Sequence, residues 1–107
     1  MKLVIAIINR DDSTAVTQNL AKNGFSSTRL STTGTFLLAG NITLLIGVQD
    51  EQVQAVIDLI HEYSHSRKQM VPALTEASYG FMPVMPVEVT VGGATVFVVN
   101  VERFERL

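Results

Sequence analysis

The chain of 107 residues contains no cysteine, which excludes disulfide bonds and thiolate metal sites. It also lacks any apolar run of about 18 residues or more, the length that a membrane-spanning helix requires. The apolar run that follows Lys2 ends at Asn9, too early for the core of a secretory signal. These absences predict a soluble protein, which we expect in the cytoplasm and without a membrane segment.

A strong excess of either charge is missing as well. The formal net charge is −2, so the chain offers no general electrostatic attraction for nucleic acid or for an anionic membrane. Hydrophobic residues make up 47% of the chain, which is normal for a globular protein. A chain of this length can bury a core without disulfides, and we expect residues 1–107 to form a single domain.

The alternation of apolar and polar residues indicates a series of strands and helices. The first strand is a continuous β-branched run, as is typical of a buried central strand. Asp12 or Ser13 is expected to cap the first helix, and Gly24 to end it. We expect strands at residues 2–8, 25–33 and 41–48, a second helix at 50–66, and a final hairpin of 87–91 and 94–101.

Two features of the C-terminal half complete this outline. Gly92 and Gly93 lie between two alternating segments, where they are typical of the tight turn of a hairpin. Residues 66–86 contain all three prolines and show no periodicity, which indicates a long loop. Loops of this length in small domains are usually functional or disordered, so this segment is a candidate contact for a ligand or a partner.

The order β-α-β-β-α-β predicts an α+β fold, a ferredoxin-like sandwich with a C-terminal hairpin. Both helices would cover one face of an antiparallel sheet and leave the other face open. The last strand is apolar on both faces, with Val96 and Val98 on one side and Phe97 and Val99 on the other. An exposed sheet face of this kind implies a partner, and self-association is the leading explanation.

The motif HEYSH, from His61 to His65, matches the H-E-x-x-H pattern of zinc hydrolases. Helical phase places both histidines and Glu62 on the flank and solvent side of the helix, and no histidine follows as a third ligand. A zinc hydrolase that uses His61 and His65 is therefore a remote alternative. A solvated helix end is the preferred interpretation.

The segment TTGTFLLAGN, residues 32–41, has glycines near both ends and apolar side chains in its middle. It lacks both the G-x-G-x-x-G pattern and the lysine of a phosphate-binding loop. Its apolar residues either complete the core, pack on a neighbouring subunit or form a binding surface. Composition alone favours packing, because apolar clusters are more often packing than pocket. Asn41 shifts the balance slightly toward a binding surface, because an amide offers the donor and the acceptor that an adenine edge requires.

Three stretches carry a resemblance to a known family: MKLVIAII at the start, GFSSTRLSTTGTFLLAGNITLLIGV, and PVEVTVGGATVFVVNVERF. Together they resemble the PII-like cyclic di-AMP receptor family of Gram-positive bacteria. The resemblance implies a ferredoxin-like subunit that assembles as a homotrimer. It also implies a non-catalytic signalling protein without cofactors, which binds cyclic di-AMP in clefts between subunits.

The resemblance also implies roles for particular residues. Thr28 would contact the phosphate region, and Gly47 would let the backbone approach the ligand closely. Asn41 would hydrogen-bond the base edge. The apolar wall against adenine would be formed by Phe36 and Leu37, with Phe97 in an adjoining wall. The loops 34–40 and about 66–85 would reorder on binding and signal to a downstream protein that the sequence does not identify.

The sequence departs from the family pattern at positions that matter for the ligand. Ser26 replaces a basic residue, Thr35 replaces a glycine, and Leu38 replaces a second basic residue. Arg29 is expected to point to the opposite face of its strand and so not to compensate. The alternative is therefore a PII-like trimer that has lost cyclic di-AMP binding and acts by protein interaction or through another small ligand.

Overall fold

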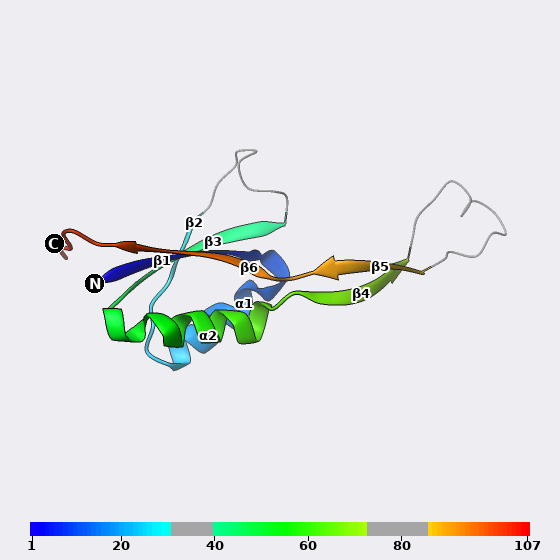
Figure 1. Cartoon of the computed structure of the whole chain (residues 1–107), viewed down its shortest axis with the longest axis horizontal. Coiled ribbons are helices and arrows are strands. Elements are labelled where there is room, and N and C mark those ends of the chain that lie inside the picture. The colour runs from blue at the N-terminus through cyan, green and yellow to red at the C-terminus, as the bar shows by residue number, and fades with distance from the viewer. Residues whose placement is uncertain (31–39, 73–85) are drawn as a thin grey trace.

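The computed structural model describes residues 1–30, 40–72 and 86–107 of the chain (Figure 1). Its helices are α1 (Ser13–Lys22) and α2 (Val53–Ser64), each preceded by a short 3₁₀ turn, Arg10–Asp12 and Asp50–Gln52. Its strands are β1 (Lys2–Asn9), β2 (Thr28–Leu30), β3 (Asn41–Val48), β4 (Arg67–Pro72), β5 (Pro86–Val91) and β6 (Ala94–Asn100).

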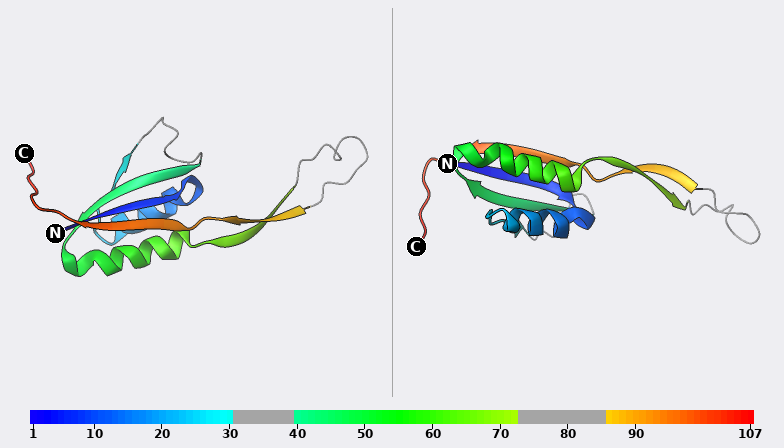
Figure 2. Two further views of the ribbon diagram at one scale, coloured as in Figure 1. Left: turned by 45° about the horizontal axis from the view of Figure 1, so that its top comes forward. Right: turned by 90° about the horizontal axis from the view of Figure 1, so that it is seen from below.

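The body of the molecule is an antiparallel sheet with strand order β2-β3-β1-β6. Both helices lie against one face of this sheet (Figure 2). The core forms between the helices and this face, because alternate residues of each strand point toward α1 and α2. The buried apolar side chains are Val4, Ala6, Ile8, Val16, Leu20, Ile42, Leu44, Ile46, Val48, Val56 and Ile60. This arrangement is consistent with the ferredoxin-like fold expected from the sequence.

The end of α1 confirms the role expected for Gly24. Its φ is 83°, a left-handed conformation that glycine adopts without strain. The Gly24 amide donates to Ala21 O at 3.0 Å, and the Phe25 amide donates to Leu20 O at 2.9 Å. These two bonds form a Schellman motif, and Phe25 then packs against the core, which fixes the entry to β2.

The start of α1 differs from the expectation. Asp12 makes no side-chain capping bond; instead, Asn9 caps the preceding turn by accepting from the Asp11 amide at 2.9 Å. The Ser13 hydroxyl donates to Arg10 O at 2.7 Å. The carboxylate of Asp12 is buried and pairs with Arg67. The side chain predicted to cap the helix therefore makes a tertiary contact instead.

The predicted C-terminal hairpin is wrong. β6 pairs with β1, and β5 pairs with β4, so Gly92 and Gly93 join two different sheets. Both glycines have positive φ, 77° and 87°, which lets the chain turn from one sheet into the other. Pairing with β1 places Val96 against the core.

The predicted loop at 66–85 is also partly wrong, because Arg67–Pro72 is strand β4. With β5 it forms a two-stranded ribbon, which projects away from the sheet beyond the ends of α2 and β6 (Figure 1). The predicted strand 25–33 is reduced to Thr28–Leu30 among the described residues. Neither helix in the described part of the chain has the length and apolar character needed to cross a membrane.

Candidate ligand-binding face

The four predicted site residues that belong to strands, Thr28, Asn41, Gly47 and Phe97, all point to the face of the sheet that the helices leave uncovered. Pairing of Thr28 with Leu45, and of Phe97 with Ile5, places them opposite to the buried side. We call this surface the open face. By register it consists of Leu3, Ile5, Ile7, Asn9, Thr28, Leu30, Asn41, Thr43, Leu45, Gly47, Thr95, Phe97 and Val99. Thr43 is buried, whereas Phe97 and Val99 are exposed.

Thr28 and Phe97 lie at opposite edges of the open face. The register joins them in one row across the sheet: Thr28 pairs with Leu45, which pairs with Ile5, which pairs with Phe97. Neighbouring strands are about 4.8 Å apart, so this row separates the two residues by about 14 Å. Phe97 is 53% exposed and lies on β6, an edge strand. One subunit therefore does not bring Thr28 and Phe97 together.

Asn41 and Gly47 lie near opposite ends of β3, about 20 Å apart at the usual rise of a strand. Asn41 is half-buried and pairs with Asn9. It follows Gly40, whose φ is 94° and whose carbonyl accepts from the Arg10 amide at 2.6 Å. A Cβ on Gly47 would meet Met1 Cε at 3.4 Å, an ordinary contact, so the subunit itself does not require glycine there.

The open face carries no ionisable side chain at any of its positions in β1, β2, β3 and β6. Its centre is aliphatic, and its polar groups are hydroxyls and amides. Arg29 pairs with Leu44 and so belongs to the helix-covered side, as the sequence predicted. A phosphate bound to this face would therefore receive neutral hydrogen bonds from these strands and no ion pair.

Ser26 is exposed and lies just before β2, outside the sheet. It borders a hollow of about 400 Å³ beside the end of α1. The other residues that line this hollow are Thr17, Ala21, Gly24, Phe25 and Ser27. The remaining predicted contacts, Thr35, Phe36 and Leu37, lie outside the described residues.

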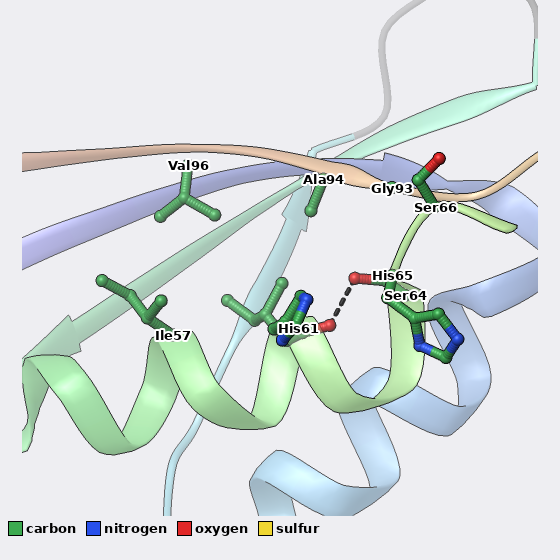
Figure 3. Close-up of a pocket in the computed structure, with 9 residues that line it drawn as sticks. Ile57, His61, Ser64, His65, Ser66, Gly93, Ala94 and Val96 are labelled. Atoms are coloured by element: carbon green, nitrogen blue, oxygen red, sulfur yellow. Dashed lines mark hydrogen bonds between the residues drawn. The ribbon is translucent and has the colours of Figure 1, made fainter.

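The two histidines of the HEYSH motif lie at the end of α2. Their rings meet edge to face with centroids 6.2 Å apart, and a ring nitrogen of His65 lies 3.2 Å from Glu62 O. Both line a hollow of about 290 Å³ between α2 and the start of β6 (Figure 3). Across residues 1–30, 40–72 and 86–107, no three metal-ligating side chains gather as a zinc hydrolase would need.

A contact that the sequence did not suggest connects Asp12 with Arg67. Arg67 Nη2 donates to Asp12 Oδ1 at 2.8 Å and Nη1 to Oδ2 at 3.3 Å, a two-pronged ion pair. The hydrogen bond to Asp12, followed by the charge of this carboxylate, raises the pKa of the Arg67 guanidinium. The two residues are 55 positions apart, so no local pattern could have indicated the pair.

The fold and the open face define a class: a small α+β protein whose uncovered sheet surface is apolar and carries polar groups near its margins. The comparisons give the family. The family model described as cyclic-di-AMP receptor matches residues 1–107. The chain therefore belongs to the cyclic-di-AMP receptor family.

A solved structure supports the fold over almost the whole chain. It is described as the crystal structure of a functionally unknown protein from Pediococcus pentosaceus ATCC 25745. The two sequences are 39% identical, and the match covers 99% of this chain and 96% of that chain with a TM-score of 0.77.

Proposed function

We propose that this protein is a non-catalytic signalling receptor that binds cyclic di-AMP between the subunits of a homotrimer. The family match over residues 1–107 carries this proposal. Thr28, Asn41, Gly47 and Phe97 support it, because all of them lie on the open face. An apolar face of this kind needs a cover, and further copies of the chain provide one without any other protein.

The spacing on the open face favours a site shared between subunits. Thr28 and Phe97 are about 14 Å apart across one sheet, on opposite edges. When open faces of different subunits meet, the Phe97 edge of one subunit can approach the Thr28 edge of the next. Thr28 would then hold the phosphate region, Asn41 would hydrogen-bond an adenine edge, and Phe36 and Leu37 would form the apolar wall.

The neutral character of the open face affects the expected affinity. Ser26 supplies a hydroxyl where the family pattern has a basic side chain, and no cation replaces it at the open-face positions of the described strands. A lost charge-assisted hydrogen bond costs about 1.5–3 kcal/mol, which is about one to two decades in affinity. We therefore expect cyclic di-AMP to bind, but less tightly than in relatives that keep the basic residue.

Calorimetric titration of the purified protein with cyclic di-AMP tests this proposal. We expect saturable binding near one ligand per subunit, reduced by Asn41→Ala and left unchanged by Arg29→Ala. Arg29→Ala is the matched control, because Arg29 lies on the adjacent strand but on the covered side. The absence of heat at high micromolar cyclic di-AMP would refute binding. A molar mass of a single chain, measured by light scattering, would refute the trimer.

A second candidate follows from the same neutral face: a trimer that no longer binds cyclic di-AMP and acts through protein contact or another small ligand. Under this alternative, Ser26→Arg combined with Thr35→Gly creates binding that the native chain lacks. Equal binding of cyclic di-AMP by the native protein and by the double variant rules out this alternative.

A further inference from the structure

The ribbon formed by β4 and β5 is tied to the body of the molecule by the Asp12–Arg67 pair. Asp12 is 8% exposed and Arg67 is 41% exposed, so the carboxylate is buried under the guanidinium. In the described part of the chain this is the one ion pair that joins the ribbon to the rest of the protein. A backbone hydrogen bond from the Gly93 amide to Ser64 O also lies at the ribbon base.

The base of the ribbon is built around the guanidinium. Arg67 Nη1 also donates to His65 O at 3.3 Å, so one side chain contacts both the body and the end of α2. Gly92 leaves the room for it: a Cβ at this position would fall well inside van der Waals contact with Nη1, and 2.8 Å from His65 O. Three residues thus meet at the ribbon base: Asp12 as the buried acceptor, Arg67 as the long donor, and Gly92, which has no side chain to block the contact.

Asp12 is in turn connected to the start of β3. It ends the 3₁₀ turn Arg10–Asp12, and the amide of Arg10 at the other end of that turn donates to Gly40 O at 2.6 Å. Gly40 immediately precedes Asn41, the residue proposed to read the adenine edge. Asp12 and Gly40 are thus joined through one short turn.

We propose that the Asp12–Arg67 pair couples the ligand-binding end of β3 to the direction of the β4–β5 ribbon. This inference rests on the proposed function for the identity of the ligand. The structure shows the pair formed, and a state in which it is broken would supply the second of the two arrangements that a coupling element requires. A ligand that draws on Asn41 shifts the balance between them and so changes the surface that the ribbon offers to a downstream protein. An isolated two-stranded ribbon is only marginally stable, so it responds to the loss of one anchor.

A first experiment needs no ligand. Arg67→Gln removes the ion pair, and we expect the Arg10 amide to exchange its hydrogen about tenfold faster or more, because its turn loses an anchor. Lys68→Gln is the matched control: Lys68 is the next residue of the ribbon and pairs with Glu88 at 3.3 Å on the exposed surface. Equal exchange at Arg10 in both variants would overturn the link between ribbon and turn.

A second experiment tests the coupling with cyclic di-AMP. The chain has no cysteine, so Gln54→Cys and Thr90→Cys place spin labels on α2 and on the ribbon without further changes. In a mixture diluted with unlabelled subunits, we expect the ligand to shift the distance between the labels. The shift persists in Lys68→Gln, is lost in Arg67→Gln and is partly restored by Arg67→Lys, which keeps the charge but not the two-pronged contact.

The outcomes separate this inference from the proposed function. If calorimetry detects no binding of cyclic di-AMP by the native chain, the proposed function is refuted. The exchange experiment still tests the mechanical link between the ribbon and the turn in that case. Binding without a distance shift, or with equal shifts in the native protein and Arg67→Gln, overturns the coupling alone. Asp12→Asn serves as a second variant if Arg67→Gln does not fold, and it is expected to abolish the same shift.

Discussion

Replacing Gly92 with alanine tests the construction of the ribbon base, with Gly24→Ala as the comparison. Both glycines have positive φ, 77° and 83°, so both substitutions carry the left-handed penalty of an L-residue, about 1 kcal/mol. At Gly24 an added Cβ meets nothing within 4 Å, so that penalty is the whole expected effect. The difference between the two variants therefore isolates the close packing around Gly92.

At Gly92 the added Cβ overlaps Arg67 Nη1 and lies 2.8 Å from His65 O, so the guanidinium has to leave. The buried Asp12 carboxylate then loses its donors, and an unsatisfied buried group costs about 1–3 kcal/mol. The total for Gly92→Ala is about 2–4 kcal/mol in the free energy of unfolding. One kcal/mol corresponds to about 4–8 °C in Tm for a domain of 60–100 residues, so this variant melts at least about 4 °C below Gly24→Ala.

The assay is thermal unfolding followed by circular dichroism, with both variants at one protein concentration because the proposed self-association would contribute to the apparent stability. Amide exchange in the ribbon is measured beside it, since loss of the anchor loosens the ribbon before it unfolds the sheet. If the two alanine variants have the same Tm and the amides of their ribbons exchange at the same rate, the packing of Arg67 against Gly92 does not stabilise the protein as described.

Three further predictions concern the core, the open face and α2. Leu44→Ala lowers the free energy of unfolding by about 2–5 kcal/mol in denaturant titration, because Leu44 is fully buried; a smaller loss would contradict its place in the core. Phe97→Asp yields folded monomers in light scattering, and an unchanged assembly would exclude this edge from the interface. Ser64→Ala changes the free energy of unfolding by at most about 1 kcal/mol, since its hydroxyl only adds a bond to Ile60 O; a larger loss refutes that account.

Much of the body of the protein could be predicted from local patterns. The β-branched run of β1, the capping glycine at Gly24 and the period of α2 are all signals that a few neighbouring residues determine. The open face followed from the same logic, because the strands alternate and only one side receives helices. Its apolar character is visible in the exposed Phe97 and Val99.

The ribbon could not be predicted for a different reason. β4 has the sequence RKQMVP, which is only half polar, shows no alternation and ends in proline, and nothing in it identifies β5 as its partner. A pair of glycines with positive φ suits both a hairpin turn and a junction between sheets, so the sequence alone does not distinguish these roles for Gly92 and Gly93. The pairing of β5 with β4 decides between these arrangements.

The sequence could predict which residues belong to the candidate site, but not how far apart they lie in the subunit. The motifs identified the family, which the match over residues 1–107 confirms. They gave no indication that Thr28 and Phe97 lie on opposite edges, because this separation follows from the strand order. The local sequence predicts a helix cap at Asp12, because the true partner of its side chain is 55 residues away.

The absence of ionisable side chains from the open face has a consequence for how such an assembly would behave in a cell. Subunits that meet through hydroxyls and aliphatic groups have no interfacial charges for salt to screen or for protons to neutralise. Their association depends on the removal of water from apolar surface, which strengthens as temperature rises from the cold. A trimer of this kind would hold its form while ionic strength and pH fluctuate around it, and would leave the bound nucleotide as the variable to which it responds.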